Sequence, residues 1–518
     1  MSETIEVLAD ISRLKACVRP EAVAMRCDDR NLTYGDLDRH SRQVAAMLAE
    51  LGVQPNQRIA WLGRSHEAFF EILFGAANAR ACLAPINTRL AIPEIAFILG
   101  DSSADLFFVT EDYFSAAEAV VAQIDRPIRL IAVDGMRPGF EDYVGLRDAA
   151  PEAAARTPLT GDDVLQLYTS GTTGLPKGVR LNNANFAAFF ETAMTFEGLD
   201  FTSEETYLAV MPLFHVGGAN PALAALAGGA RLVLVSAFDP ASALRMIETE
   251  QATRIGFVPA MINMLLQCPT FADTDFSSVK TLLYGASPIS EAVLYAARAR
   301  FGCGFVQMYG MTETNASGTV LTTDDHRPEL LRSCSLAWAK HKVRIANEAG
   351  EEVANGEVGE IQIRGPAVMA GYWNRPEATA ETLTTEGWLK TGDAGHRNDD
   401  GYVFVYDRVK GMIVSGGENV YPAEVENAIL GCPGVADAAV IDVPHSTWGE
   451  AVKAIVVLSP GAEPDPDAII SWARQKIAGY KVPKSVDFID ALPRNATNKV
   501  LRRVLREPYW SGHGRLVG

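Results

Sequence analysis

The sequence predicts an α/β protein, with a large N-terminal domain of layered α/β subdomains and a small α+β domain at the C-terminus. Three observations support this fold class. With 518 residues, the chain is too long for one hydrophobic core. Helix and strand patterns alternate through residues 31–110 and again through 205–310, which is typical of largely parallel sheets. A short polar joint near residue 410 is followed by roughly 110 residues, enough for a domain of their own.

The first alternation begins with a capped helix. Thr33 precedes a segment with one apolar face, and Gly52 is a suitable end for that helix. RIAWLG at 58–63 predicts a buried strand, EAFFEILFGAANA at 67–79 a second helix, and CLAPIN at 82–87 a second strand. This order is a βαβ pattern.

Later segments indicate where the domains end. Residues 148–163 are rich in Ala, Pro and Asp and predict a connector. GEIQI at 359–363 alternates polar and apolar side chains, as a half-exposed strand does. Pro422 begins a new helix soon after the polar joint at 407–410. We therefore expect an N-terminal domain at 1–408 and a C-terminal domain at 411–518.

Composition restricts the class of protein. Apolar residues make up 48% and charged residues 21%, as in soluble globular proteins. A net charge of -18 argues against nucleic acid or an anionic membrane as the main partner. The seven cysteines are scattered without a CxxC pair, which suits a reducing compartment and gives no zinc signature. The acidic N-terminus and the lack of an 18-residue apolar run predict a cytoplasmic protein without a transmembrane segment.

YTSGTTGLPKGVRL, residues 168–181, is a loop crowded with Gly, Ser and Thr. A Walker P-loop needs G-x-x-x-x-G-K-[ST], but here Gly171 and Gly174 are three apart and Lys177 follows Pro176. The hydroxyl and backbone N–H groups of such a loop still suit a phosphate. By itself, the loop leaves a surface turn open as the other interpretation.

The loop is one of a series of motifs that span essentially the whole chain. The others are LAPINTRLAIPEIAFILGDS (83–102), PLFHVGG (212–218), YGAS (284–287), QMYGMTE (307–313), GEIQIRG (359–365), GWLKTGD (387–393), YDRVKGMIVSGGENVYPAEVE (406–426) and LPRNATNKVLR (492–502). In kind and order they resemble the adenylate-forming (AMP-binding) superfamily of acyl-CoA synthetases, peptide-synthetase adenylation domains and beetle luciferases. The chain is most similar to the acyl-CoA synthetase, or fatty-acid–CoA ligase, branch.

The resemblance implies an ATP site. It makes Lys499 the main cation at the α-phosphate, with Thr312 beside that phosphate and Glu313 as the Mg²⁺ ligand. Tyr309 would stack on adenine, and Asp393 would bind the ribose together with an arginine. The implied ATP- and AMP-binding residues are Thr169, Ser170, Gly171, Thr172, Thr173, Gly174, Lys177, Gly285, Ala286, Ser287, Gln307, Met308, Tyr309, Gly310, Asp393 and Arg408. Asn498 replaces the glycine that usually precedes the lysine, and Asn tolerates a left-handed backbone better than most residues.

The resemblance also places His215 beside the acyl pocket and among the catalytic residues. Amino-acid-activating relatives carry Asp at this position to pair with the substrate ammonium, so an amino-acid substrate is not expected. The implied pocket residues are His215, Val216, Gly217, Gly218, Val258, Met261 and Met311, for which ordinary core packing is the alternative. RSCSLA at 332–337 replaces a usually Gly-rich segment and leaves the floor of this pocket undefined.

The acceptor side lies in the small domain. SGGEN at 415–419 resembles the CoA-ligase form of the joint, in which Gly416 and Gly417 let the pantetheine arm pass. Trp448 resembles an aromatic residue that some CoA ligases place against CoA, and a half-buried aromatic residue of the small domain is the other interpretation. Lys410 takes the hinge position, about which a mobile small domain would rotate between two reaction steps.

The expected function is that of an ATP-dependent acyl-CoA synthetase. A carboxylate and ATP would give acyl-AMP and pyrophosphate, and CoA would then give acyl-CoA and AMP, with Mg²⁺ present. A medium- or long-chain fatty acid is the favoured substrate. An aromatic acid of benzoate or cinnamate type, or a carrier protein as acceptor of a stand-alone adenylation enzyme, remains the alternative. The acid, its chain length, the pathway and a homo-oligomeric state stay open.

Overall fold

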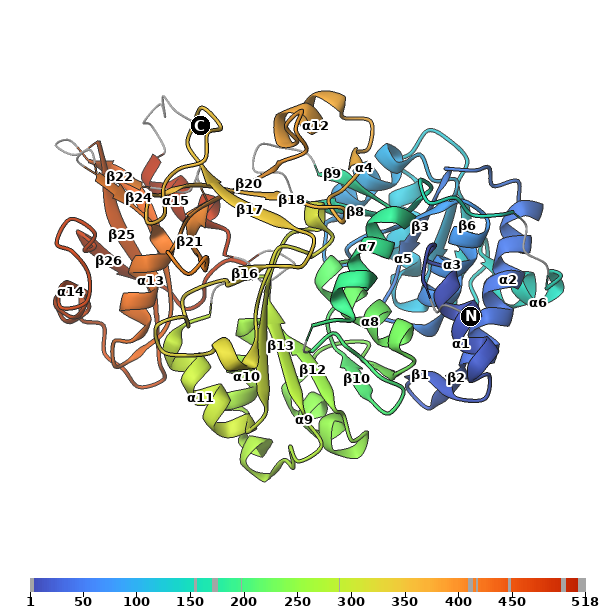
Figure 1. Ribbon diagram of the computed structural model, residues 1–518, viewed down its shortest axis with the longest axis horizontal. Coiled ribbons are helices and arrows are strands. Elements are labelled where there is room, and N and C mark those ends of the chain that lie inside the picture. The colour runs from blue at the N-terminus through green and yellow to red at the C-terminus, as the bar shows by residue number, and fades with distance from the viewer. Residues whose placement is uncertain are drawn as a thin grey trace.

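The protein, a computed structural model, consists of a large and a small part. The structure describes residues 4–152, 156–169, 176–196, 198–287, 289–408, 413–415, 418–445, 449–494 and 500–510. Figure 1 shows the larger N-terminal part, coloured from blue through yellow to the orange of α12, beside a smaller C-terminal part in darker orange and red. The predicted α/β fold class, with a large N-terminal and a small C-terminal domain, is therefore confirmed.

One sheet of the large domain has the strand order β19-β9-β8-β4-β3-β5-β6-β7. β3 lies between β4 and β5 and runs parallel to both, whereas β8 and β9 are antiparallel. Parallel strands covered on both faces need continuous apolar runs, which RIAWL and LFFV provide. The strands are β3 (Arg58–Leu62), β4 (Cys82–Pro85), β5 (Leu106–Val109), β6 (Arg129–Ala132), β7 (Glu141–Asp142), β8 (Asp163–Thr169), β9 (Lys177–Asn182) and β19 (Gly371–Tyr372).

The second sheet has the order β16-β15-β14-β13-β12-β10-β11-β1-β2. Its centre, from β11 across β10 and β12 to β14, is parallel, and β15 joins β14 in the antiparallel sense. The strands are β1 (Val23–Cys27), β2 (Arg30–Thr33), β10 (Thr206–Ala209), β11 (Arg231–Leu234), β12 (Arg254–Phe257), β13 (Thr281–Gly285), β14 (Gly304–Tyr309), β15 (Thr319–Leu321) and β16 (Leu336–Ala337).

Helices cover these two sheets. α2 packs along α3, and α8 packs on β10 and β11. The helices are α1 (Asp10–Val18), α2 (Tyr34–Glu50), α3 (Glu67–Asn78), α4 (Ile92–Ser102), α5 (Phe114–Val121), α6 (Tyr143–Ala149), α7 (Asn183–Ala193), α8 (Val216–Gly228), α9 (Pro240–Thr249), α10 (Pro259–Gln267) and α11 (Glu291–Phe301).

Two further sheets complete the fold. An antiparallel sheet in the order β17-β18-β20-β21 ends the large domain, and β21 contacts α13 of the small domain. The small domain has the order β23-β22-β25-β24, with β26 parallel to β25. The elements are β17 (Lys342–Ala346), β18 (Gly359–Arg364), α12 (Pro376–Thr382), β20 (Leu389–Arg397), β21 (Val403–Arg408), β22 (Ile413–Ser415), β23 (Glu418–Val420), α13 (Pro422–Leu430), β24 (Val435–His445), β25 (Gly449–Leu458), α14 (Pro466–Arg474), β26 (Ser485–Phe488) and α15 (Arg502–Trp510).

The local predictions for the first alternation are confirmed. The Thr33 side chain accepts a hydrogen bond from the Asp36 backbone and forms a capping box at the start of α2. Gly52 follows α2 with a φ of +84°, a conformation that favours glycine. The predicted strands and the helix between them correspond to β3, α3 and β4, and Pro422 opens α13.

The prediction that GEIQI alternates between exposed and buried side chains is wrong. Ile361, Gln362 and Ile363 are all buried in β18. The Gln362 side chain accepts a hydrogen bond from Arg344 and donates one to Glu360, so its amide is satisfied without solvent. The polar residue in this pattern therefore lies in the interior.

The C-terminal helix α15 is docked on β24. Arg502 forms a bidentate ion pair with Glu426, and Arg506 pairs with Asp442. The Trp510 indole donates to the Asp442 carbonyl at 3.1 Å. The basic side chains of this helix thus stabilise the small domain.

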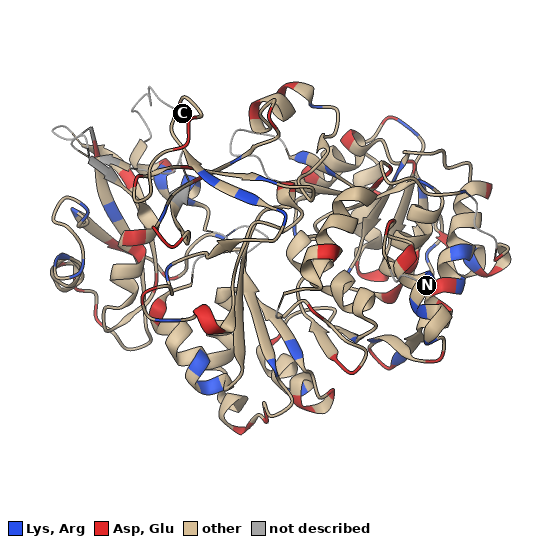
Figure 2. Ribbon diagram, viewed as in Figure 1, with Lys and Arg blue, Asp and Glu red and all other residues tan. Residues whose placement is uncertain are grey.

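Charged residues occur throughout both parts of the molecule. Figure 2 shows acidic and basic positions interspersed along the ribbon of both parts. Among the described helices, none has the length and apolar character needed to cross a membrane. All seven cysteines are free thiols, of which Cys27, Cys82, Cys334 and Cys432 are buried.

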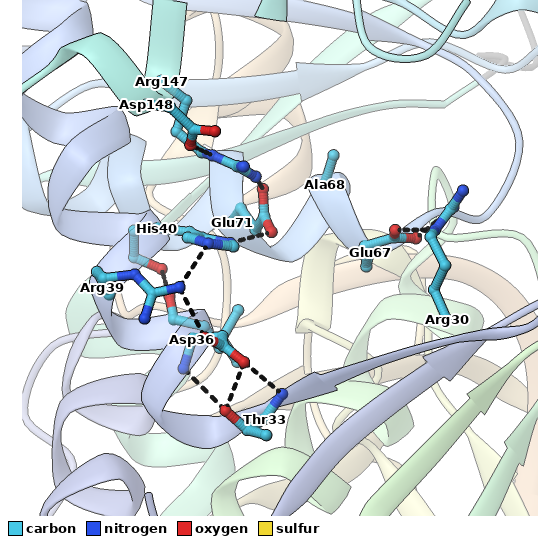
Figure 3. A network of polar contacts seen from close by, with 12 residues as sticks. Arg30, Thr33, Asp36, Arg39, His40, Glu67, Ala68, Glu71, Arg147 and Asp148 are labelled. Carbon is cyan, nitrogen blue, oxygen red and sulfur yellow. Dashed lines mark hydrogen bonds and ion pairs between the residues drawn. The ribbon is translucent and has the colours of Figure 1, made fainter. Parts of the chain in front are cut away.

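A buried carboxylate ties three helices of the large domain together (Figure 3). Glu71 on α3 accepts from His40 on α2 at 2.7 Å, and from Tyr143 and Arg147 on α6 at 2.6 and 3.0 Å. Burial alone raises the pKa of Glu71, but the contacts with His40, Arg147 and Tyr143 more than offset it and lower the pKa below its ordinary value. The charged form of Glu71 is therefore the stabilising one.

Replacing Glu71 by glutamine is expected to lower the free energy of unfolding by about 3 kcal/mol, because its partners His40 and Arg147 then no longer contact a buried negative charge. The contribution of Glu71 is complete above its unfolded pKa of about 4.3 and disappears as the pH falls through the lower folded pKa. Urea unfolding at pH 7 and pH 4 should therefore show a smaller difference between variant and wild type at the lower pH. An equal difference at both values would contradict this account.

Candidate active site

The carboxyl ends of parallel strands bring several predicted motifs to one edge of the second sheet. β10, β12, β13 and β14 run parallel and adjacent. The segments that leave them at this edge contain His215, Val258, Ala286 and Met311 in turn. Open α/β sheets bind ligands at the carboxyl ends of their strands. The topology therefore gathers the YGAS, YGMTE and FHVGG segments into one region.

Glu313 connects the two large sheets. It follows β14 of the second sheet, and its Oε1 accepts a hydrogen bond from the Tyr372 hydroxyl of β19 at 2.8 Å. The Thr169 hydroxyl, at the end of β8, donates to the same oxygen at 3.4 Å. Only 5% of Glu313 and 8% of Tyr372 is exposed. A carboxylate is thus fixed where the YGMTE segment meets Thr169, at the start of the predicted phosphate loop.

Lys177 also lies close to Tyr372. It is the register partner of Thr169 in the β8–β9 pair, so both ends of the loop are held by one antiparallel ladder. Its Nζ is 5.1 Å from the centre of the Tyr372 ring. The other predicted loop residues, 170–174, lie outside the described residues.

Tyr309 and Asp393 form the second contact between sheets. The Tyr309 hydroxyl donates to Asp393 Oδ2 at 2.7 Å. Burial and the Asp393 charge raise the pKa of Tyr309 well above its ordinary value, so the phenol stays protonated and donates. Asp393 on β20 is the register partner of Arg408 on β21, which brings the two predicted ribose residues to adjacent backbone positions.

Close approach of backbone segments explains why glycine occupies positions 285 and 310 of the YGAS and YGMTE segments. A Cβ at Gly285 would lie 2.2 Å from the Met308 carbonyl, and one at Gly310 would lie 2.6 Å from the Ala316 carbonyl. Ala286 has a φ of +67°, which is unusual for a residue with a side chain. Three further residues predicted to contact the nucleotide are partly exposed at the same edge of the second sheet: Ser287, Gln307 and Thr312.

The FHVGG segment begins helix α8. His215 is the N-cap residue, and its ring packs edge-on against Phe214. A Cβ at Gly218 would lie 2.3 Å from the Pro212 carbonyl, so Gly218 is needed for packing. A Cβ at Gly217 would meet only the end of Met211 at 3.9 Å. Of the two glycines, Gly217 is the one that leaves open space.

The other predicted pocket residues flank this helix end. Val258 is buried and is the N-cap residue of α10. Met261 and Met311 are partly buried and pack against two different core clusters of the large domain. Val216 is partly buried against the same cluster as Met311. The geometry is compatible with both of the roles that the sequence leaves open for them.

Ser335, in the RSCSLA segment, has a backbone conformation that favours glycine. Its φ is +84°, and its side chain is completely buried. Within the described residues, its Oγ has no hydrogen-bond partner. The bridge to Val403 and the Ser333 hydroxyl, which accepts from the Ser335 backbone at 2.8 Å, hold the strained backbone in place.

Replacing Ser335 by glycine is expected to raise the free energy of unfolding by about 1 kcal/mol, because relief of strain exceeds the entropy that glycine loses. Ser333→Ala is the matched control and is expected to destabilise, since its hydroxyl also donates to the Val403 carbonyl at 2.8 Å. Urea denaturation midpoints of both variants provide the measurement. A destabilised Ser335→Gly variant would contradict the conclusion that the backbone is strained at Ser335.

Several predicted residues of the small domain lie outside the described residues: Lys410, Gly416, Gly417, Trp448, Asn498 and Lys499. The side chain of Arg408 is also not described. The flanking strands are informative, because Ser415 pairs with Gly449. This pairing brings the sequence neighbours of Gly416 and Trp448 to the same end of the small-domain sheet.

Sequence reasoning missed two features of the site. Tyr372 was not identified, although the segment GYWNRP that contains it lies between two of the recognised motifs. A buried amide chain also supports the YGMTE loop: Asn220 of α8 donates to Asn315, and Asn315 donates to the Asn185 carbonyl. Asn315 has a φ of +52°, a conformation that asparagine tolerates. Only three-dimensional proximity identifies this chain of amides.

Comparisons with known proteins agree with this geometry. Residues 13–373 match the AMP-binding enzyme family, and residues 424–499 match the AMP-binding enzyme C-terminal domain. A fatty acid–[acyl-carrier-protein] ligase, ScoC, of Streptomyces coeruleorubidus is 38% identical, covering 99% of this chain and 98% of that protein. A feruloyl-CoA synthase of an Amycolatopsis species is 40% identical, covering 96% and 97%. The crystal structure of ATP-bound MatB from Rhodopseudomonas palustris superposes with a TM-score of 0.86 at 28% identity, covering 96% and 99%.

Proposed function

The chain belongs to the AMP-binding enzyme family and is an acid–thiol ligase, and from this premise we propose that it activates a medium- or long-chain fatty acid. The acid attacks the α-phosphate of ATP, which forms acyl-AMP and releases pyrophosphate. The thiol of CoA then attacks the acyl carbon, which forms the thioester and releases AMP.

The observation that carries the first step is the position of Glu313, which accepts hydrogen bonds from Tyr372 and from Thr169 at the start of the predicted phosphate loop. Mg²⁺ is bound by one or two carboxylates and completes its shell with phosphate oxygens and water, so one fixed carboxylate suits it. Within the described ranges, no group of three or more His, Cys, Asp or Glu side chains forms a metal site of its own. When bound, Mg²⁺ neutralises charge on the phosphate oxygens.

We assign the remaining nucleotide contacts as the sequence resemblance implies them. Asp393 accepts from the ribose hydroxyls, and its bond to Tyr309 fixes the adenine-stacking ring relative to the ribose. Lys177 binds the terminal phosphates, and Thr312 contacts the α-phosphate. Lys499 stabilises the charge that develops there in the transition state.

The acyl pocket lies beside His215. The side chains of the other predicted pocket residues are apolar, and the chain leaves open space at Gly217. A fatty chain gains roughly 0.8 kcal/mol for each buried CH₂ group in such surroundings. No carboxylate among these residues would pair with an ammonium group, which disfavours an amino acid.

Two alternatives have support of their own. The 40% identity with a feruloyl-CoA synthase supports an aromatic acid as substrate. The 38% identity with an acyl-carrier-protein ligase supports a carrier protein as acceptor in place of CoA. In either case the first step is unchanged.

We place the domain boundary between residues 408 and 411, with Lys410 as the hinge. In the present arrangement, the rings of Tyr406 and Tyr421 stack across this boundary at 4.9 Å. The ion pair of Lys481 and Glu424 lies next to them in the small domain. Rotation would separate this stack and bring Gly416 and Gly417 toward the acyl-AMP. The free cysteines suit a cytoplasmic location.

The test is mass-spectrometric detection of acyl-AMP and acyl thioester with ATP, Mg²⁺ and a panel of fatty, aromatic and short acids, in the presence of CoA or a carrier protein. Fatty acyl-CoA as the dominant product would support the proposal. If feruloyl- or benzoyl-type products dominate, the substrate is an aromatic acid and not a fatty acid. If thioester forms only on the carrier protein, the acceptor is that protein and not CoA. Absence of acyl-AMP with every acid would reject the function.

A further inference from the structure

The hydroxyl group of Tyr372 has no assigned role in the reaction. Tyr372 ends the short strand β19, and its register partner is Val179, two residues after Lys177. Its ring is buried, and its hydroxyl donates to Glu313 Oε1 at 2.8 Å. One side chain therefore joins the phosphate-loop hairpin to the carboxylate proposed to bind Mg²⁺.

The two oxygens of Glu313 have different surroundings. Oε1 accepts from both Tyr372 and Thr169. Across the part of the chain that the structure describes, no hydrogen bond reaches Oε2. The two hydroxyl groups thus fix the orientation of the carboxylate through one oxygen and leave the other oxygen for a ligand.

The face of the Tyr372 ring contacts a second group, the ammonium of Lys177. Lys177 Nζ is 5.1 Å from the ring centre, a distance at which an ammonium is attracted to an aromatic face. The same residue therefore orients a carboxylate through its hydroxyl and a cation through its ring. These are the two kinds of group that contact Mg²⁺ and phosphate.

The backbone holds Tyr372 firmly enough for this task. Its N–H donates to the Thr379 hydroxyl at 2.9 Å, and the Trp373 N–H donates to the Gly178 carbonyl at 2.7 Å. The Trp373 indole donates to the Asp101 carbonyl at 3.0 Å. The ring position is therefore determined by contacts outside the nucleotide site.

We propose that Tyr372 is a positioning residue, which presents Glu313 Oε2 to Mg²⁺ and holds Lys177 toward the phosphates of ATP. The inference rests on the proposed function, because it concerns the same nucleotide site. Residues that orient a metal ligand typically change metal affinity by about 10–100-fold when they are replaced.

The test compares Tyr372→Phe with wild type by isothermal titration calorimetry of ATP binding at increasing Mg²⁺ concentrations. AMP binding without Mg²⁺ is the second readout. The variant keeps the ring and loses the hydroxyl, so its apparent Mg²⁺ affinity is expected to fall about tenfold. AMP affinity is expected to remain within about twofold of wild type, because the hydroxyl donates to Glu313, which is not one of the residues proposed to bind ribose and adenine. Tyr372→Leu, which also loses the ring face, should weaken ATP binding further.

Tyr143→Phe is the matched control, because it removes another buried tyrosine hydroxyl that donates to a buried carboxylate, at 2.6 Å. It should reduce stability and leave the Mg²⁺ dependence unchanged. Thr169→Val removes the other donor to Glu313 Oε1, and a smaller shift in the same direction is expected.

Two outcomes would overturn the role of Tyr372. In one, Tyr372→Phe and Thr169→Val both keep the wild-type Mg²⁺ dependence. In the other, Tyr372→Phe loses AMP binding as strongly as Mg²⁺-dependent ATP binding, which would indicate a purely structural role. A wild-type protein that neither binds ATP nor forms acyl-AMP would instead reject the proposed function itself, and the inference with it.

Discussion

Replacing Lys499 by alanine is expected to slow acyl-AMP formation about 10²–10³-fold and to leave the conversion of supplied acyl-AMP into acyl-CoA within a few fold of wild type. The reason is that, in the proposed function, Lys499 stabilises charge at the α-phosphate only in the first step. If the small domain rotates between the steps, this lysine is not needed for thiol attack. Separate assays of the two half-reactions, with pyrophosphate release for the first and thioester formation from synthetic acyl-AMP for the second, provide the measurement.

The matched control is Lys484→Ala, an exposed lysine of the same domain whose Nζ lies 3.4 Å from the Gly479 carbonyl. Both half-reactions should be unchanged in this variant. Equal losses of both half-reactions in Lys499→Ala would contradict a role confined to the first step. An unchanged first half-reaction would show that another cation serves the α-phosphate, or that Asn498 keeps Lys499 from reaching it.

The parts of the fold that depend on local pattern were predictable. The capping box at Thr33 and the apolar run of β3 each follow from neighbouring residues, and the structure confirms them. GEIQI shows where local pattern fails. Gln362 is polar but buried, because Arg344 and Glu360 satisfy its amide, and both partners are identified only once the strands are paired.

In the candidate site, too, some residues were predictable from local sequence and others were not. Glu313, Lys177 and Asp393 stand out through the motifs that contain them. Their elements belong to three different sheets, which are joined by the contacts of Glu313 with Tyr372 and of Asp393 with Tyr309. Tyr372 and Asn315 act through contacts between segments that are distant in the chain, so no spacing rule reveals them. Gly218 illustrates a third case: the sequence leaves both a pocket and a packing role open, and a Cβ at this position would lie 2.3 Å from the Pro212 carbonyl, so glycine is needed for packing.

Replacing Glu313 by glutamine is expected to reduce acyl-AMP formation by at least about 100-fold, because the variant keeps the shape of the side chain and loses its charge. The Glu313→Gln substitution is not expected to disturb the fold, since the new amide oxygen can still accept from Tyr372 and Thr169 in place of Oε1. The NH₂ group of the amide would then occupy the position of Oε2. An amide nitrogen donates hydrogen bonds and does not bind Mg²⁺, so the proposed metal contact is lost.

The same variant separates the metal contact from nucleotide binding in general. In the proposed function, AMP binding without Mg²⁺ depends on Asp393 and Tyr309 and not on Glu313, so calorimetry should find it within a few fold of wild type. Glu191→Gln, which removes an exposed carboxylate paired with Lys340, is the control for loss of one negative charge and should leave both measurements unchanged. If Glu313→Gln formed acyl-AMP at the wild-type rate, Glu313 would not be the Mg²⁺ ligand. In that case the carboxylate between the two sheets would serve only to hold Thr169 and Tyr372 together.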